Sequence, residues 1–198
     1  MINDPLKSIP AVTVPEQETN AAGIVRLRLV PADQLRFIKP ERFPRPGHRG
    51  YPEFTLSEQH LLFADGASLV DVDVMPDYAF FSEDTETDAN GRYFRPTIQL
   101  TIPKIRPETT IWLQRYEHVK WVAFLQDRNG FCRCVGTPDQ PLIIGFGQAT
   151  GGKNGRNQTT LTFSTSVEQP AYYMLGIEDS YLIDSTADFN SAFGFEFK

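Results

Sequence analysis

The stretch that comes nearest to a ligand-binding motif is rich in glycine and spans residues 147–154. A first glycine, four further residues and then Gly152-Lys153 match the beginning of a phosphate-binding loop. Such a loop continues with a Ser or Thr hydroxyl for the magnesium ion and with a helix whose N-terminus faces the phosphates. Here Asn154 replaces the hydroxyl, and a strand-like pattern begins at Thr159. We therefore interpret residues 145–157 as a hairpin tip and expect no nucleotide cofactor.

Oxygen-bearing side chains alternate before a glycine in residues 86–91, as they do at the start of an EF-hand calcium loop. The first position holds Glu86 instead of Asp, and the twelfth holds Thr97 instead of a bidentate Glu. No helical pattern flanks the stretch. We interpret it as an exposed acidic turn, with an adventitious weak calcium contact as the alternative.

Cys132 and Cys134 are the only cysteines, and one residue separates them. On a strand both would point to the same face, where a disulfide between them would be strained, so we expect two reduced, packed thiols. His48, His60 and His118 are not spaced to complete a metal site. The His-Glu-x-x-His and Gly-x-Ser-x-Gly motifs of hydrolases do not occur. The sequence predicts no catalytic, cofactor-binding or metal-ligating residues, and we do not expect an enzyme.

Charge is unevenly distributed along a chain whose net charge is -6. Residues 26–49 contain seven Lys or Arg against two acidic residues, whereas residues 71–88 contain seven acidic residues and no Lys or Arg. Such blocks are usually solvated loops, but in a self-assembling subunit they can form complementary faces. An acidic channel lining would also repel DNA phosphates. A sequence pI of about 5.1 argues against a dedicated nucleic-acid-binding protein.

The length of 198 residues favours a single domain. Residues 1–23 are polar, proline-containing and without periodicity, which predicts a flexible N-terminal arm that orders against a neighbouring subunit. Residues 24–198 are expected to form the domain. No apolar run approaches the ~20 residues of a membrane span or the pattern of a signal peptide, so we expect synthesis in the cytoplasm and no membrane contact.

Alternating apolar residues and turn signals divide the domain into strands, the first at residues 24–30. Four turn signals each predict a hairpin. The expected strand pairs are residues 60–63 with 68–74, 78–81 with 93–102 across an acidic tip at 82–91, 120–126 with 131–135 across Asn129-Gly130, and 142–146 with 159–166. Late strands are expected at residues 172–175 and 193–197, and the five prolines of residues 31–52 predict a long loop.

A helix is predicted at residues 107–119. Pro107 suits the first helical position, and the Glu108 carboxylate is favourable near the helix N-terminus. Trp112, Tyr116 and Val119 form one apolar stripe, which predicts that Trp112 is buried against the sheet. The expected fold class is mainly β: a single β-sandwich or barrel domain with one principal α-helix, long loops and an extended N-terminal arm.

Between residues 94 and 173 an extended segment, this helix, the Asn-Gly hairpin, the glycine-rich hairpin and Pro170-Ala171-Tyr172-Tyr173 follow one another. This order resembles structural proteins of bacteriophage and prophage tail modules, and more loosely the β-sandwich-plus-helix proteins that stack into tail tubes. The resemblance implies a virion protein, made in the host cytoplasm and located in the tail. It implies a tail tube subunit that forms homo-oligomeric rings, with a hexamer expected, stacked around a channel through which DNA passes without specific binding. Other tail proteins would be its further partners.

Two alternatives remain open. A tail terminator or distal tail ring protein of the same module could share the fold. A β-sandwich that binds carbohydrate or a host surface would present aromatic residues in a groove, and Phe43, Tyr51 and Phe54 are the candidates for that role. For the tube subunit we expect the tip at residues 145–157 to reach a neighbouring subunit through Lys153 and Arg156.

Overall fold

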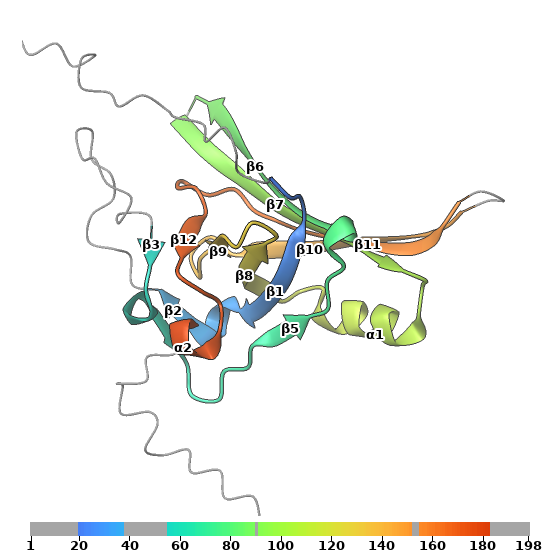
Figure 1. Ribbon diagram of the computed structural model, residues 1–198, viewed down its shortest axis with the longest axis horizontal. Coiled ribbons are helices and arrows are strands. Elements are labelled where there is room, and N and C mark those ends of the chain that lie inside the picture. Colours follow the sequence, from blue (N-terminus) through green and yellow to red (C-terminus); the bar gives the residue numbers. More distant parts are fainter. Residues whose placement is uncertain (1–19, 38–54, 90, 152–154, 183–198) are drawn as a thin grey trace, which may run out of the picture.

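Most strands of this protein gather into one large sheet around two apolar clusters (Figure 1). The computed structural model describes residues 20–37, 55–89, 91–151 and 155–182. The strands are β1 (Ile24–Pro31), β2 (Leu35–Phe37), β3 (Thr55–Leu56), β4 (Leu61–Phe63), β5 (Val70–Val72), β6 (Ala79–Asp88), β7 (Gly91–Pro103), β8 (Lys120–Asp127), β9 (Cys132–Val135), β10 (Leu142–Thr150), β11 (Asn157–Ser164) and β12 (Tyr172–Met174). The helices are α1 (Pro107–Tyr116) and the short α2 (Asp179–Leu182). The predicted fold class, mainly β and sandwich-like with one principal helix, is confirmed.

The main sheet has ten strands in the order β3-β12-β9-β8-β10-β11-β7-β6, with β1 beside β8 and β5 beside β1. Only β3 and β12 pair in parallel; the other pairs of this sheet are antiparallel. The sheet branches at β8, which pairs with β1 along its length and with both β9 and β10. Strands β2 and β4 form a separate small sheet. Within the described ranges the main sheet does not close into a barrel.

Strand β8 separates the two apolar clusters. Trp121, Ala123 and Leu125 belong to the first cluster, and Val122 and Phe124 belong to the second. Because both faces of the strand are covered, these five consecutive residues are all buried, and the sequence shows an unbroken apolar run instead of an alternation. The first cluster lies against α1, and the second includes side chains from β2, β4 and the end of the described chain.

Helix α1 supports the first cluster through fewer buried side chains than predicted. Leu113 is its one buried residue, whereas Trp112 and Tyr116 are only partly buried. The two aromatic rings pack on the buried Trp121, with ring centroids 6.1 and 6.3 Å from it. The helix ends at Tyr116, three residues before the predicted end. The prediction that Trp112 is buried is therefore correct only in part.

The hairpin predicted between residues 60–63 and 68–74 is wrong. Its turn exists, because the Ala67 N–H donates to the Ala64 carbonyl at 2.9 Å and Gly66 has a φ of +74°. The strands on either side diverge, however: β4 pairs with β2, and β5 pairs with β1. Burial explains the separation, since Leu61 of β4 belongs to the second cluster whereas β5 packs against the first.

The acidic segment of residues 82–91 is largely strand and not a loop tip. Strands β6 and β7 pair from Ala79–Leu100 out to Asp88–Gly91. The Tyr93 hydroxyl donates to Glu86 at 2.5 Å, and the Arg95 guanidinium lies 3.1 Å from the same carboxylate. These cross-strand contacts between polar side chains stabilise a strand pair that extends beyond the apolar core.

The Asn129-Gly130 hairpin between β8 and β9 is confirmed, with Gly130 at a φ of +89°. The Asp127 carboxylate accepts the N–H groups of Asn129 and Phe131 and so closes the turn. Residues 20–23 lie against this turn, because the Ala21 N–H donates to the Asn129 side chain at 2.8 Å. The rest of the predicted arm, residues 1–19, and the late strand at residues 193–197 lie outside the described residues, as does most of the proline-rich loop.

Candidate assembly interface

Four strands extend one part of the sheet beyond the apolar core. In Figure 1 the β6–β7 hairpin and the β10–β11 hairpin project from the body toward different sides. The four strands pair in the order β10-β11-β7-β6, and each pair is antiparallel. The stagger is large: β6 pairs with residues 91–100 of β7, whereas β11 pairs with residues 97–103. We call these strands the extended sheet.

Both edges of the extended sheet are open within the described part of the chain. Strand β6 stands at the end of the sheet order and pairs with β7 alone. Strand β10 pairs with β8 only at Leu142 and Ile143, so residues 144–150 pair on one side only, with β11. An open edge presents backbone N–H and C=O groups that another strand can pair with.

One face of the extended sheet carries mostly uncharged side chains near β10 and β11, and the charged side chains of Asp84, Glu86, Asp88 and Arg95 in its outer part. The registers place the following residues on this face: Phe80 and Ser82 on β6, Thr97, Gln99 and Thr101 on β7, Thr160, Thr162 and Ser164 on β11, and Ile143, Gly145 and Gly147 on β10. The alternate residues, such as Ile98, Leu100 and Phe163, belong to the first apolar cluster. A shallow groove lined by Arg95, Thr97, Ile143 and Thr162 runs over this face.

The base of the β10–β11 hairpin rests on helix α1. The Gln148 side chain donates to the Thr110 hydroxyl at 2.8 Å and lies 3.5 Å from the hydroxyl of the fully buried Thr159. Beyond this point every described residue of β10 is exposed. Strand β10 is thus supported up to Gln148, whereas on β11 the Asn157 carbonyl still accepts the Lys104 N–H at 2.8 Å.

The hairpin tip bends too tightly for a side chain at Gly151. A Cβ atom added there would lie 2.3 Å from the Gly155 Cα. The Arg156 guanidinium stacks 5.8 Å from the ring of Tyr78 and donates to its hydroxyl, so it is held within its own chain. Lys153 lies outside the described residues.

The motifs that could bind ligands do not have the geometry that their chemistry needs. Residues 147–150 belong to strand β10, and the segment after the tip is strand β11, where a phosphate-binding loop requires a helix. The EF-hand-like residues 86–88 likewise lie in a strand. No group of three or more potential metal ligands occurs in the part of the chain that the structure describes. None of the helices described there is long and apolar enough to cross a membrane.

The cysteines and histidines are accounted for by local contacts. Both thiols are free and buried, as predicted, and burial raises the pKa of the Cys134 thiol to about 12. That thiol lines a pocket of about 300 Å³ between residues 136–140 and 167–172, but with this pKa it is protonated at neutral pH and is a poor nucleophile. His60 Nδ1 lies 3.0 Å from the Ser57 hydroxyl, and His118 lies beside Glu117 at the surface. His48 lies outside the described residues.

Sequence reasoning expected edge strands for contacts between subunits but did not locate them on β6 and β10. The signal was present in the pattern of β10, because residues 145–150 carry almost no large apolar side chain and cannot belong to a strand buried on either face. The aromatic candidates Phe43, Tyr51 and Phe54 lie outside the described residues. Comparison with protein-family models, curated proteins and solved structures finds no match for this chain.

Proposed function

We propose that this protein is a structural subunit of a bacteriophage tail, most simply the tail tube subunit, and that its copies join edge to edge through the extended sheet. The observation that carries the proposal is the pair of open edges, on β6 and on residues 144–150 of β10. These edges belong to one continuous four-stranded sheet. A contact between them in successive copies uses two different surfaces, and such a contact closes into a ring when the rotation permits.

The directions of the strands suit this contact. Strands β10, β11, β7 and β6 alternate in direction, so β6 of one copy beside β10 of the next copy continues the antiparallel alternation. The stagger along β7 also favours closure, because strands in a closed sheet are tilted and offset from their neighbours. Residues 144–150 contain no Pro or Lys, the residues that commonly prevent edge-to-edge pairing.

The two faces of the extended sheet fit the inside and the outside of such a ring. The face that packs on the first cluster and α1 would lie outside. The opposite face would line the channel, including Asp84, Glu86 and Asp88 of β6 and Arg95 of β7. Arg95 pairs with Glu86, so the lining carries hydroxyl groups, amides and an excess of carboxylates. Such a lining offers DNA phosphates few attractive contacts, so DNA could pass without binding.

Negative-stain electron microscopy of the purified protein tests the assembly directly. Hollow tubes of stacked rings are expected. Isolated rings would favour the alternative of a tail terminator or distal tail ring protein. Monomers at high concentration would contradict ring assembly and favour the surface-binding alternative.

The edge is tested by a double variant, Gly147→Lys with Ala149→Lys. Both positions are exposed on β10, and an added Cβ at Gly147 meets nothing within 4 Å, so the fold should tolerate the change. Two charges within a newly paired sheet would prevent edge pairing. Ile111→Lys on the exposed side of α1 adds a lysine away from the edge and should leave assembly intact. Equal assembly by both variants would contradict the proposed contact.

A further inference from the structure

The last described residues fold back over β1 and cover the second apolar cluster. Ile177 and Leu182 are both 0% exposed and belong to this cluster. Ile177 precedes α2 and Leu182 is its last residue, and none of residues 175–182 belongs to a strand of either sheet. We call residues 175–182 the C-terminal strap.

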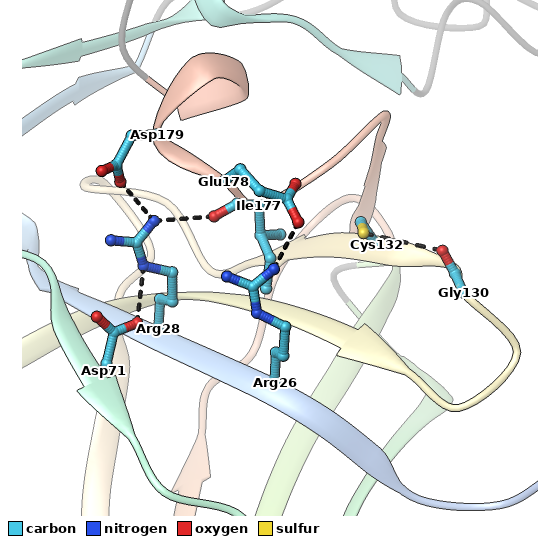
Figure 2. Close-up of polar contacts among 8 residues, drawn as sticks. All are labelled: Arg26, Arg28, Asp71, Gly130, Cys132, Ile177, Glu178 and Asp179. Carbon is cyan, nitrogen blue, oxygen red and sulfur yellow. Dashed lines mark hydrogen bonds and ion pairs between the residues drawn. The ribbon is translucent and has the colours of Figure 1, made fainter.

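Two arginines of β1 hold the strap by charge (Figure 2). Arg28 Nη1 donates to the Ile177 carbonyl at 2.9 Å and to Asp179 Oδ1 at 2.7 Å. Arg26 Nη1 donates to Glu178 Oε1 at 2.5 Å. The Nε atom of Arg28 also lies 3.0 Å from Asp71 on β5, so this guanidinium lies between one carboxylate of the strap and one of the sheet.

The strap lies beside Cys132. Cys132 and Cys134 belong to the second cluster and are 3% and 0% exposed. Burial and then the nearby Glu178 carboxylate raise the pKa of the Cys132 thiol, which is consistent with the position of the strap beside β9. Removing the strap would give a thiol reagent access to Cys132, which is 3% exposed in the folded protein.

We infer that the C-terminal strap is a detachable cover, which opens as a unit while the sheet stays folded, and that its ion pairs with Arg26 and Arg28 set how often it opens. Among the side chains that the structure describes, its anchors are the two fully buried ones and the arginine contacts. The entropy of ordering eight residues opposes them, so opening requires far less free energy than global unfolding. The strap carboxylates are also accessible to salt, since the Glu178 and Asp179 side chains are 49% and 72% exposed.

The test measures the reaction of Cys132 with N-ethylmaleimide, located by peptide mass spectrometry. The double variant Glu178→Gln with Asp179→Asn removes the strap's charges and keeps its shape. We expect its Cys132 to react roughly tenfold faster than in the parent protein, as the loss of two ion pairs implies. Salt should accelerate the reaction of the parent but have little effect on the variant.

Asp71→Asn is the matched control. Like the Asp179 change, it removes a carboxylate that pairs with Arg28, but Asp71 lies on β5 and not on the strap. The two side chains are nearly equally exposed, Asp71 at 74% and Asp179 at 72%. Asp71→Asn should leave the Cys132 rate close to that of the parent. Hydrogen exchange gives a second readout: amides of residues 177–182 should exchange faster in the double variant while those of β8 do not. Equal rates in the two variants, or acceleration of β8 and strap amides together, would show that the cysteines are reached by global unfolding and would overturn the inference.

Discussion

At the scale of single residues, partly buried charged side chains lie where β6 comes close to β9 and β12. The Arg133 guanidinium lies 5.5 Å from the ring centroid of Phe81 and 5.2 Å from that of Tyr173, and it pairs with Asp127 at 3.1 Å. Nearby, the Glu83 carboxylate accepts the Ala171 N–H at 2.8 Å. These residues are far apart in the chain, so no local pattern could have predicted their contact.

Glu83 is expected to make stability depend on pH. Burial raises the pKa of its carboxyl, although the Ala171 N–H and Arg133 act in the opposite direction. The folded state therefore favours the protonated form, and this contribution is complete below the unfolded pKa of about 4.3 and is lost as pH rises through the folded pKa. We expect Glu83→Gln, which keeps an acceptor but no charge, to have a higher Tm than the parent at neutral pH.

The difference in Tm between Glu83→Gln and the parent should disappear in acid, where the parent's carboxyl is protonated. Glu86→Gln is the control, because Glu86 pairs with Arg95 across the strands and its neutralisation should bring no gain. A Tm advantage of Glu83→Gln that stays constant across the pH range would mean that the charge of Glu83 is not the cause.

The packing of α1 also makes a prediction for single residues. Leu113→Ala should lower the free energy of unfolding by about 2–5 kcal/mol, because the residue is fully buried and its truncation leaves a cavity. Ile111→Ala on the same helix should change it by less than about 0.5 kcal/mol, since Ile111 is 57% exposed. Denaturant melts of both variants check the pair, and similar losses would show that the helix packs differently.

At the scale of elements, the sequence predicted strands and turns better than it predicted partners. Asn129-Gly130 and Pro107 mark their elements correctly because the conformations they favour are local. Asp65-Gly66 forms its turn but not its hairpin, because β4 packs in the second apolar cluster and β5 packs against the first. Nothing local determines that choice. The length of β6 was missed for a related reason: its outer half is stabilised by cross-strand contacts with β7 and not by an apolar face.

The β10–β11 hairpin should be removable without loss of the fold. Replacing residues 149–158 by Asn-Gly would join Gln148 to Thr159 through a two-residue turn, and these two residues already face each other. The shortened protein keeps the Gln148–Thr110 contact and all of the described apolar clusters. We expect a Tm close to that of the parent and a loss of rings and tubes, measured by calorimetry and electron microscopy. Unimpaired tubes would exclude the outer hairpin from the contact between subunits.

At the scale of the whole molecule, the two charge blocks are less available to partners than the sequence suggests. In the basic block, Arg26 and Arg28 pair with Glu178, Asp179 and Asp71 of the same chain. In the acidic block, Glu86 pairs with Arg95, and Asp77 pairs with Arg128. For these described residues, attraction between neighbouring copies is therefore a weak candidate for the force that drives assembly.

Salt should then favour assembly, contrary to what attraction between charge blocks predicts. In the proposed ring, Asp84 and Asp88 of each copy lie on the channel face, where the carboxylates of all copies repel one another. Raising the ionic strength shortens the Debye length from about 10 Å at 0.1 M to about 3 Å at 1 M, so this repulsion is screened while backbone pairing at the edges is not. Sedimentation velocity should show more assembled protein as salt rises, and Asp84→Asn with Asp88→Asn should assemble readily at low salt. If assembly weakened steadily with salt in both proteins, attraction between subunits would dominate, and the acidic residues would not face each other across a channel.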